Sequence, residues 1–145
     1  MQFQSHSLCF HLLLVILAFG STPASMLAGP AFELDEDAVS SISVSLTHRL
    51  DRGEIVEDFR LPSRSHPEMV SLIEGASPHR SEIDWAVLGD LKIDVGSQVM
   101  DMRLFSGGKE LVFEVRNGPG GKYEAGSLAA FLRLVDEARA AQAKD

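Results

Sequence analysis

Cysteine is almost absent from this chain of 145 residues, because Cys9 is the only one. It lies within the first 28 residues, which we interpret below as a leader. If that leader is removed, disulfide bonds, thiol catalysis and cysteine-based zinc sites are all excluded. Asparagine is equally scarce. Asn117 is followed by Gly-Pro, so the chain contains no acceptor site for N-glycosylation.

Charge is missing from the N-terminal part of the chain, where no Asp, Glu, Lys or Arg precedes Glu33. Residues 8–20 form a short apolar run that is followed by small residues and Pro23. This pattern is typical of a secretory signal peptide, although the usual basic residue before the apolar run is absent. We therefore predict that residues 1–28 are a signal peptide or, alternatively, a membrane anchor spanning residues 8–27. The candidate cleavage points follow Ala24, Ala28 and Ala31.

Clusters of basic residues are also lacking. The formal net charge is −8, from 21 acidic and 13 basic residues, and the basic residues are scattered among acidic ones. Binding to a phosphate backbone relies on clustered Lys and Arg side chains. We expect no nucleic acid among the partners of this protein.

Period-two alternation predicts five strands after an acidic linker at residues 29–40. The strands are expected at residues 41–47, 55–61, 91–95, 99–105 and 111–115. The first two flank a turn at Gly53 and should form a hairpin. The other three are joined by short connections and should follow as antiparallel neighbours.

Two amphipathic helices are predicted as well. The first covers residues 63–75, with Ser65 and Glu68 at the spacing of a capping box and Gly75 at its end. The second begins after Ser127 as its N-cap. Its predicted apolar stripe comprises Leu128, Phe131, Leu132 and Val135. Residues 137–145 have high helix propensity but little to bury, and we expect them to fray.

Together these elements predict an α+β fold. We expect a single small domain at residues 41–136, with a mostly antiparallel five-stranded sheet. The element order is β-β-α-β-β-β-α, and both helices should pack on one face of the sheet because each has a single apolar stripe.

Two short motifs resemble functional loops without meeting their chemical requirements. Residues 117–123 are rich in glycine like a phosphate-binding loop, but Arg116 stands in place of its first glycine and Tyr123 in place of its magnesium-binding hydroxyl. Ser106 and Lys109 match a Ser-x-x-Lys pattern, but the two glycines between them indicate a tight turn rather than a helix start. Neither motif predicts an activity.

Metal ligation and catalysis are equally unsupported by the sequence. The histidines after the leader, His48, His66 and His79, do not have the spacing of metal ligands. Met100 and Met102 have the spacing of two side chains on one strand face, which favours a core position over a copper site. We therefore name no catalytic residue, no metal site and no cofactor, and an enzyme is less expected than a binding protein.

One candidate binding site lies at the start of the first predicted helix. Arg60, Arg64 and His66 surround its amino terminus, where unpaired N–H groups and the helix dipole favour anions. A carboxylate, a sulfate or an acidic side chain of a partner could dock there. The competing interpretation is that Ser65 and Glu68 already satisfy those N–H groups.

The sequence as a whole favours a small exported domain, periplasmic or secreted, that binds a protein or another component of the cell envelope without catalysis. Two alternatives stay open, namely an extracytoplasmic enzyme of unknown reaction and a membrane-anchored accessory subunit. A membrane is a partner only if the N-terminal segment is not cleaved. A clustered pocket with a shifted carboxylate or histidine would favour the enzyme, whereas an apolar patch or an unpaired sheet edge would favour the binding domain.

Overall fold

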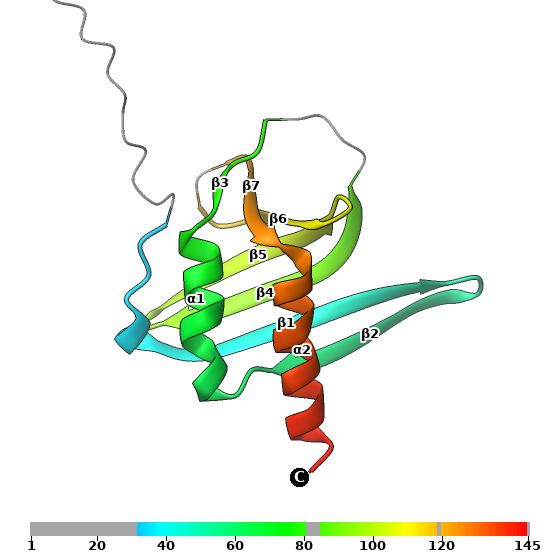
Figure 1. Cartoon of the computed structure of the whole chain (residues 1–145), viewed down its shortest axis with the longest axis horizontal. Coiled ribbons are helices and arrows are strands. Elements are labelled where there is room, and N and C mark those ends of the chain that lie inside the picture. Colours follow the sequence, from blue (N-terminus) through cyan, green and yellow to red (C-terminus); the bar gives the residue numbers. More distant parts are fainter. Residues whose placement is uncertain (1–31, 81–84, 119, 145) are drawn as a thin grey trace, which may run out of the picture.

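The computed structural model describes residues 32–80, 85–118 and 120–144, which form one antiparallel sheet of seven strands and two α-helices (Figure 1). The strands are β1 (Val39–Leu50), β2 (Gly53–Arg60), β3 (Ser77–Pro78), β4 (Ala86–Val95), β5 (Gln98–Ser106), β6 (Glu110–Val115) and β7 (Lys122–Ser127). The helices are α1 (His66–Glu74) and α2 (Leu128–Gln142). The prediction of an α+β fold is confirmed.

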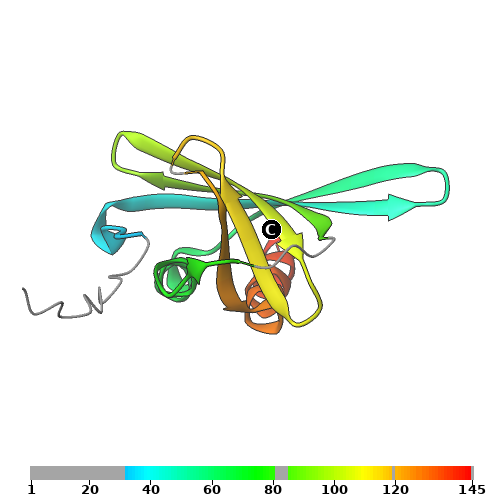
Figure 2. The same ribbon diagram turned by 90° about the horizontal axis from the view of Figure 1, so that it is seen from above.

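The order of the strands in the sheet is β2-β1-β4-β5-β6-β7-β3. Strands β4 to β7 form a meander, and the chain crosses from β2 at one edge, through α1, to β3 at the other edge. Both helices lie on the same side of the sheet (Figure 2). The apolar side chains of that face, from Ile42 of β1 to Phe113 of β6, form one core with those of the helices. Alternation along each strand supplies this apolar face and leaves the opposite face largely polar.

The prediction of five strands is wrong, because the sheet also contains β7 and the short β3, where alternation predicts no strand. Strand β7 follows the glycine-rich turn and pairs with β6, with Tyr123 opposite Phe113. Strand β3 pairs with β7 through Ser77 and Pro78 alone. Both are held by partners distant in the sequence, so local alternation gives little indication of them. The glycine-rich loop thus joins two strands rather than a strand and a helix.

The N-terminal side of the domain is packed and not merely a linker. Residues 1–31, including the predicted leader and the start of the predicted linker, lie outside the described residues. Phe32 is buried, and its ring meets the rings of Phe113 and Tyr123 at centroid distances of 5.5 and 4.7 Å. The backbone N–H of Leu34 donates to the Glu74 carboxylate at the end of α1. The described part of the acidic segment therefore covers one end of the core.

Helix α2 begins as predicted but buries a different stripe. The Ser127 hydroxyl accepts a hydrogen bond from the N–H of Ala130 at 3.3 Å, which confirms the N-cap. The assignment of Leu132 to the buried stripe is wrong, because its side chain is 39% exposed. The buried residues of the helix are Phe131, Leu134, Val135 and Ala138. Since α2 continues to Gln142 and buries Ala138, the segment after residue 136 has more to bury than expected.

The β1–β2 hairpin projects from the rest of the molecule (Figures 1 and 2). It is the predicted hairpin, with Leu50 paired to Gly53 at its turn. Strand β1 pairs with β4 only as far as Leu46, which lies opposite Gly89. Beyond this point the pairing of β4 with β5 is irregular between Val87 and Gly89. Residues 47–50 therefore pair with β2 alone, and this end of the hairpin leaves the sheet.

Neither helix of the described residues is both long and apolar enough to cross a bilayer. Residues 8–27, the alternative anchor, lie outside the part of the chain to which this finding applies.

Candidate functional site

The predicted capping box at the start of α1 is not formed. Ser65 makes no side-chain hydrogen bond to the helix N–H groups, and its hydroxyl instead donates to the Glu137 carboxylate of α2 at 3.2 Å. The Glu68 carboxylate is bound by Arg133, also from α2. Both polar side chains are therefore used to join the two helices. The capping-box prediction is wrong because tertiary partners compete with the local one.

The three residues of the predicted anion site have different environments. His66 is buried, and its Nε2 lies 3.2 Å from the carbonyl oxygen of Leu61. Arg60 ends β2 and Arg64 lies in the 3₁₀ turn before α1, and both are exposed. Within the described residues, the side chain of neither arginine makes a hydrogen bond or ion pair. Anion binding by Arg60, Arg64 and His66 stays a prediction, with His66 already engaged by a backbone carbonyl.

The three histidines of the domain are engaged separately. His48 of β1 lies 3.2 Å from Glu57 of β2, and His79 lies 3.2 Å from Glu124 of β7. His66 faces the Leu61 carbonyl. In the described part of the chain no three His, Cys, Asp or Glu residues are grouped so that they could hold a metal ion.

The base of the β1–β2 hairpin is braced by α2. The Arg139 guanidinium donates to the Glu57 carboxylate at 3.0 Å and lies over the Phe59 ring, 5.1 Å from its centroid. His48 contacts the same carboxylate from β1. Hydrogen bonding by Arg139 lowers the pKa of Glu57 below its ordinary value, partial desolvation opposes this, and His48 lowers the pKa further.

We expect the substitution Arg139→Ala to raise the pKa of Glu57, because it removes the strongest stabilisation of the carboxylate. The folded-state pKa is below the unfolded one, so this contact stabilises the protein above the unfolded pKa and is lost as the pH falls through the folded pKa. The measurement is an NMR titration of the Glu57 side chain. Arg133→Ala is the control, since Arg133 pairs with Glu68 and Glu137 instead. An unchanged Glu57 pKa in Arg139→Ala would contradict the brace.

Beyond this brace the hairpin exposes apolar side chains. We call residues 47–56 the arm. Leu50, Ile55 and Val56 are 56%, 50% and 57% exposed. Because Leu46 and Phe59 face the core, alternation places Leu50 and Ile55 on the helix side of the arm and Val56 on the opposite side. Charged residues surround them at the turn, including Arg49, Asp51, Arg52 and Glu54.

The outer edge of the arm is continuous with the free edge of the sheet. The N–H of Leu61 donates to the carbonyl of Ile42 at 2.9 Å. Hydrogen-bonded pairs recur at every second position of an antiparallel ladder. The Leu61–Ile42 bond therefore shows which of the β1–β2 residue pairs are hydrogen-bonded. The residues of β2 that alternate with the hydrogen-bonded ones direct their N–H and C=O groups away from β1. These residues are Glu54, Val56, Asp58 and Arg60. No other strand of the described sheet lies beyond β2.

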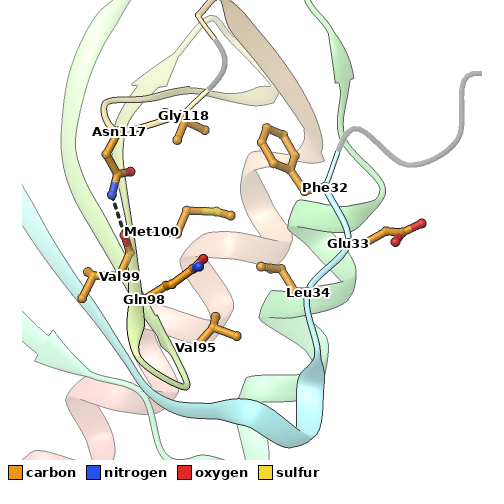
Figure 3. Close-up of a pocket in the computed structure, with 10 residues that line it drawn as sticks. Phe32, Glu33, Leu34, Val95, Gln98, Val99, Met100, Asn117 and Gly118 are labelled. Carbon is orange, nitrogen blue, oxygen red and sulfur yellow. Dashed lines mark hydrogen bonds between the residues drawn. The ribbon is translucent and has the colours of Figure 1, made fainter.

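A second feature is a half-open cavity of about 430 Å³ at the opposite end of the sheet. Figure 3 shows Phe32 and Leu34 on one side of it and Met100 and Gln98 on the other. Glu33, the single ionisable residue among those lining it, points away (Figure 3). The cavity offers apolar surface and side-chain amides but no group for acid–base chemistry.

No protein-family model, no curated protein and no solved structure matches this chain.

The sequence pattern alone does not indicate that the arm is a site. Its strands and turn are predicted by alternation, but their exposure depends on where β4 stops pairing with β1. One local signal was available. Ile55 and Val56 are adjacent, so they place apolar side chains on both faces of one strand. A strand at the edge of a one-sided sheet would ordinarily have a polar residue on its outer face.

Proposed function

We propose that this protein is a small exported domain that binds another protein, or a component of the cell envelope, through its β1–β2 arm without catalysis. The observation that carries the proposal is the projection of Leu50, Ile55 and Val56 from the domain, with about half of each side chain exposed. Exposed apolar side chains bordered by charged residues are typical of interaction surfaces. Leu50 and Ile55 provide such side chains on the helix side of the arm, and Val56 provides one on the opposite side. Packing of these side chains against a partner would remove them from water.

The distribution of the remaining polar groups supports a binding role over an enzymatic one. Glu57, whose pKa is lowered by Arg139, lies in the brace of the hairpin, and Arg133, whose pKa is raised by Glu68, joins α1 and α2. Neither residue lines the cavity at the other end of the sheet. An active site usually combines a concave pocket with titratable groups of perturbed pKa. Here, within the described residues, the cavity and the shifted groups are separate.

The alternative is that the protein is a membrane-anchored accessory subunit whose N-terminal segment is not cleaved. It would use the same arm but keep residues 8–27 in the membrane. The charge-free start of the chain and its short apolar run are the observations in favour of export or anchoring.

Photo-crosslinking in the organism that makes the protein tests the proposal. We expect a photoreactive amino acid at Ile55 to form a discrete crosslinked species with one partner, because the arm would be buried in that complex. The same group at Leu132, an exposed apolar position on α2, is the matched control. Mass spectrometry of the crosslinked product identifies the partner and gives the N-terminal residue, which separates a cleaved leader from a retained anchor.

The expected result is a crosslink from Ile55 that is absent from Leu132 and is weakened by the double substitution Leu50→Ser and Val56→Thr. Equal crosslinking from both positions would contradict a binding role for the arm. No crosslink from Ile55 at native expression levels would contradict it as well.

A further inference from the structure

The two edges of the sheet differ greatly in what they offer to another strand. At one edge, β3 consists of Ser77 and Pro78 only. A strand this short, with a proline that has no N–H, is a poor template for pairing. At the other edge, β2 is eight residues long and contains no proline. Four of its residues direct N–H and C=O groups outward, as derived above for Glu54, Val56, Asp58 and Arg60.

The charges along this edge discriminate between possible occupants. Glu54, Glu57 and Asp58 give the eight residues of β2 three acidic side chains, and Arg60 at the end is the only basic one. A second copy pairing antiparallel about Val56 would place Glu54 opposite Asp58 of the copy. Pairing about Glu57 would place two Glu57 side chains opposite each other, although Glu54 would then face Arg60 of the copy. Like charges directly opposite destabilise a strand pair, so neither of these two arrangements is free of repulsion.

The same charges favour a basic strand. A partner segment with Lys or Arg four residues apart would place them opposite Asp58 and opposite Glu54, which Arg49 also contacts at 3.4 Å. Val56 lies between these two acids on the same face of β2. Asp58 accepts a hydrogen bond from the Ser45 hydroxyl at 2.6 Å, which holds its carboxylate at the edge. A β-branched residue of the partner opposite Val56 would cover that exposed side chain.

We propose that β2 binds an extended basic segment of another protein, which joins the sheet as an eighth strand beside β2. The main-chain groups of Glu54, Val56, Asp58 and Arg60 would provide the hydrogen bonds, and the acidic side chains would select for positive charge. This inference rests on the binding function proposed above and specifies the chemistry of the partner.

The direct test uses the purified, naturally processed protein and three synthetic heptapeptides. The first is acetyl-Thr-Lys-Thr-Val-Thr-Lys-Thr-amide, in which both Lys side chains lie on the same face as Val. The second has the same sequence and charge, with methyl groups on two consecutive central amide nitrogens. Because consecutive N–H groups point to opposite edges of a strand, neither edge of this peptide can pair fully with β2. The third replaces each Lys by Glu. We expect the first peptide to bind, the second to bind about 10-fold more weakly or worse, and the third not to bind.

Two variants at Val56 locate the binding on the protein. Val56→Pro removes an outward N–H that β1 does not use, and such edge positions accept proline. Val56→Thr retains that N–H and a β-branched shape. We expect Val56→Pro to weaken binding of the first peptide about 10-fold or more and Val56→Thr to change it less than about 3-fold. Circular dichroism and the urea midpoint of both variants check that the hairpin is retained.

The outcomes separate the two proposals. If the methylated peptide binds as well as the unmodified one, or if the first peptide does not bind at all, strand addition at β2 is wrong. If the Val56→Pro variant binds the first peptide like the wild type while remaining folded, it is also wrong. Crosslinking from Ile55 in the organism would survive each of these results, and then the arm binds a partner by its side chains alone.

Discussion

The substitution Gly89→Ala should lower the free energy of unfolding by about 3–5 kcal/mol, a large part of the stability of a small domain. Gly89 lies in β4 with a φ of 148°, in the range that favours glycine. A Cβ at this position would overlap the backbone carbonyl of Ser45 in the neighbouring strand β1. The backbone cannot give way without breaking the β1–β4 ladder, which joins the β1–β2 hairpin to the rest of the sheet.

The control for this prediction is Gly96→Ala in the β4–β5 turn. Gly96 has a φ of 58°, but a Cβ there would have no heavy atom within 4 Å. Its cost is then the strain of the left-handed conformation alone, about 1–2 kcal/mol. Urea denaturation followed by circular dichroism measures both variants. If Gly89→Ala costs no more than Gly96→Ala, the close approach of β4 to β1 is not present in solution.

The second large effect is expected for Leu134→Ala in α2, which should cost about 2–5 kcal/mol. The Leu134 side chain is 1% exposed and belongs to the core between α2 and the sheet. Its removal leaves a cavity that rigid neighbours cannot fill, so the lost contacts add to the lost transfer free energy. The measurement is again the free energy of unfolding from urea denaturation.

Leu132→Ala provides a matched control for Leu134→Ala, because it changes the same residue type two positions earlier in the same helix. Leu132 is 39% exposed, and we expect its loss to cost less than about 1 kcal/mol. The pair also decides between two faces of α2, since the sequence pattern alone assigns Leu132 to the buried stripe. Similar costs for both substitutions would show that α2 packs in a different rotation.

Much of the fold was predictable because its elements carry strong local signals. The alternation in residues 41–47 and 55–61 predicted the β1–β2 hairpin, and Ser127 was correctly predicted as the N-cap of α2. These signals are read within one element and need no knowledge of the neighbours. They fail where the neighbours decide, as in β7. Only Tyr123 and Ala125 of that strand point toward the core, and Gly126 weakens its strand pattern further.

The position of Phe32 illustrates a second limit. It follows the predicted leader and precedes a cluster of acids, a context that indicates a solvated linker. Its burial depends on the space left between Phe113 and Tyr123, which come from the other end of the chain. The stripe of α2 shows the same limit, because Phe131, Leu134, Val135 and Ala138 fit a helical spacing as well as the predicted set did. Tertiary packing selected between them.

The candidate site was less predictable than the fold. The sequence directed attention to Arg60, Arg64 and His66, because charged residues near a helix start have a recognised chemistry. The apolar side chains of the arm are exposed because no second strand of the described sheet pairs with β1 beyond Leu46, and no local sequence pattern indicates where that pairing ends. The arm arises where the ladder between β1 and β4 ends at Leu46 and Gly89. The close backbone approach at Gly89 therefore also determines how much of the hairpin is left without a second neighbour.

The inequality of the two sheet edges has a consequence for stoichiometry. A protein with two open edges can be joined head to tail, and repetition of that contact builds filaments. Here the β3 edge ends in Ser77 and Pro78, and pairing of the β2 edge with itself about Val56 or Glu57 brings like charges together. Among the described strands, a strand bound at β2 would find no comparable edge on the other side of the sheet. The proposed strand addition would then be monovalent, and the domain would terminate, rather than propagate, any sheet that it joins.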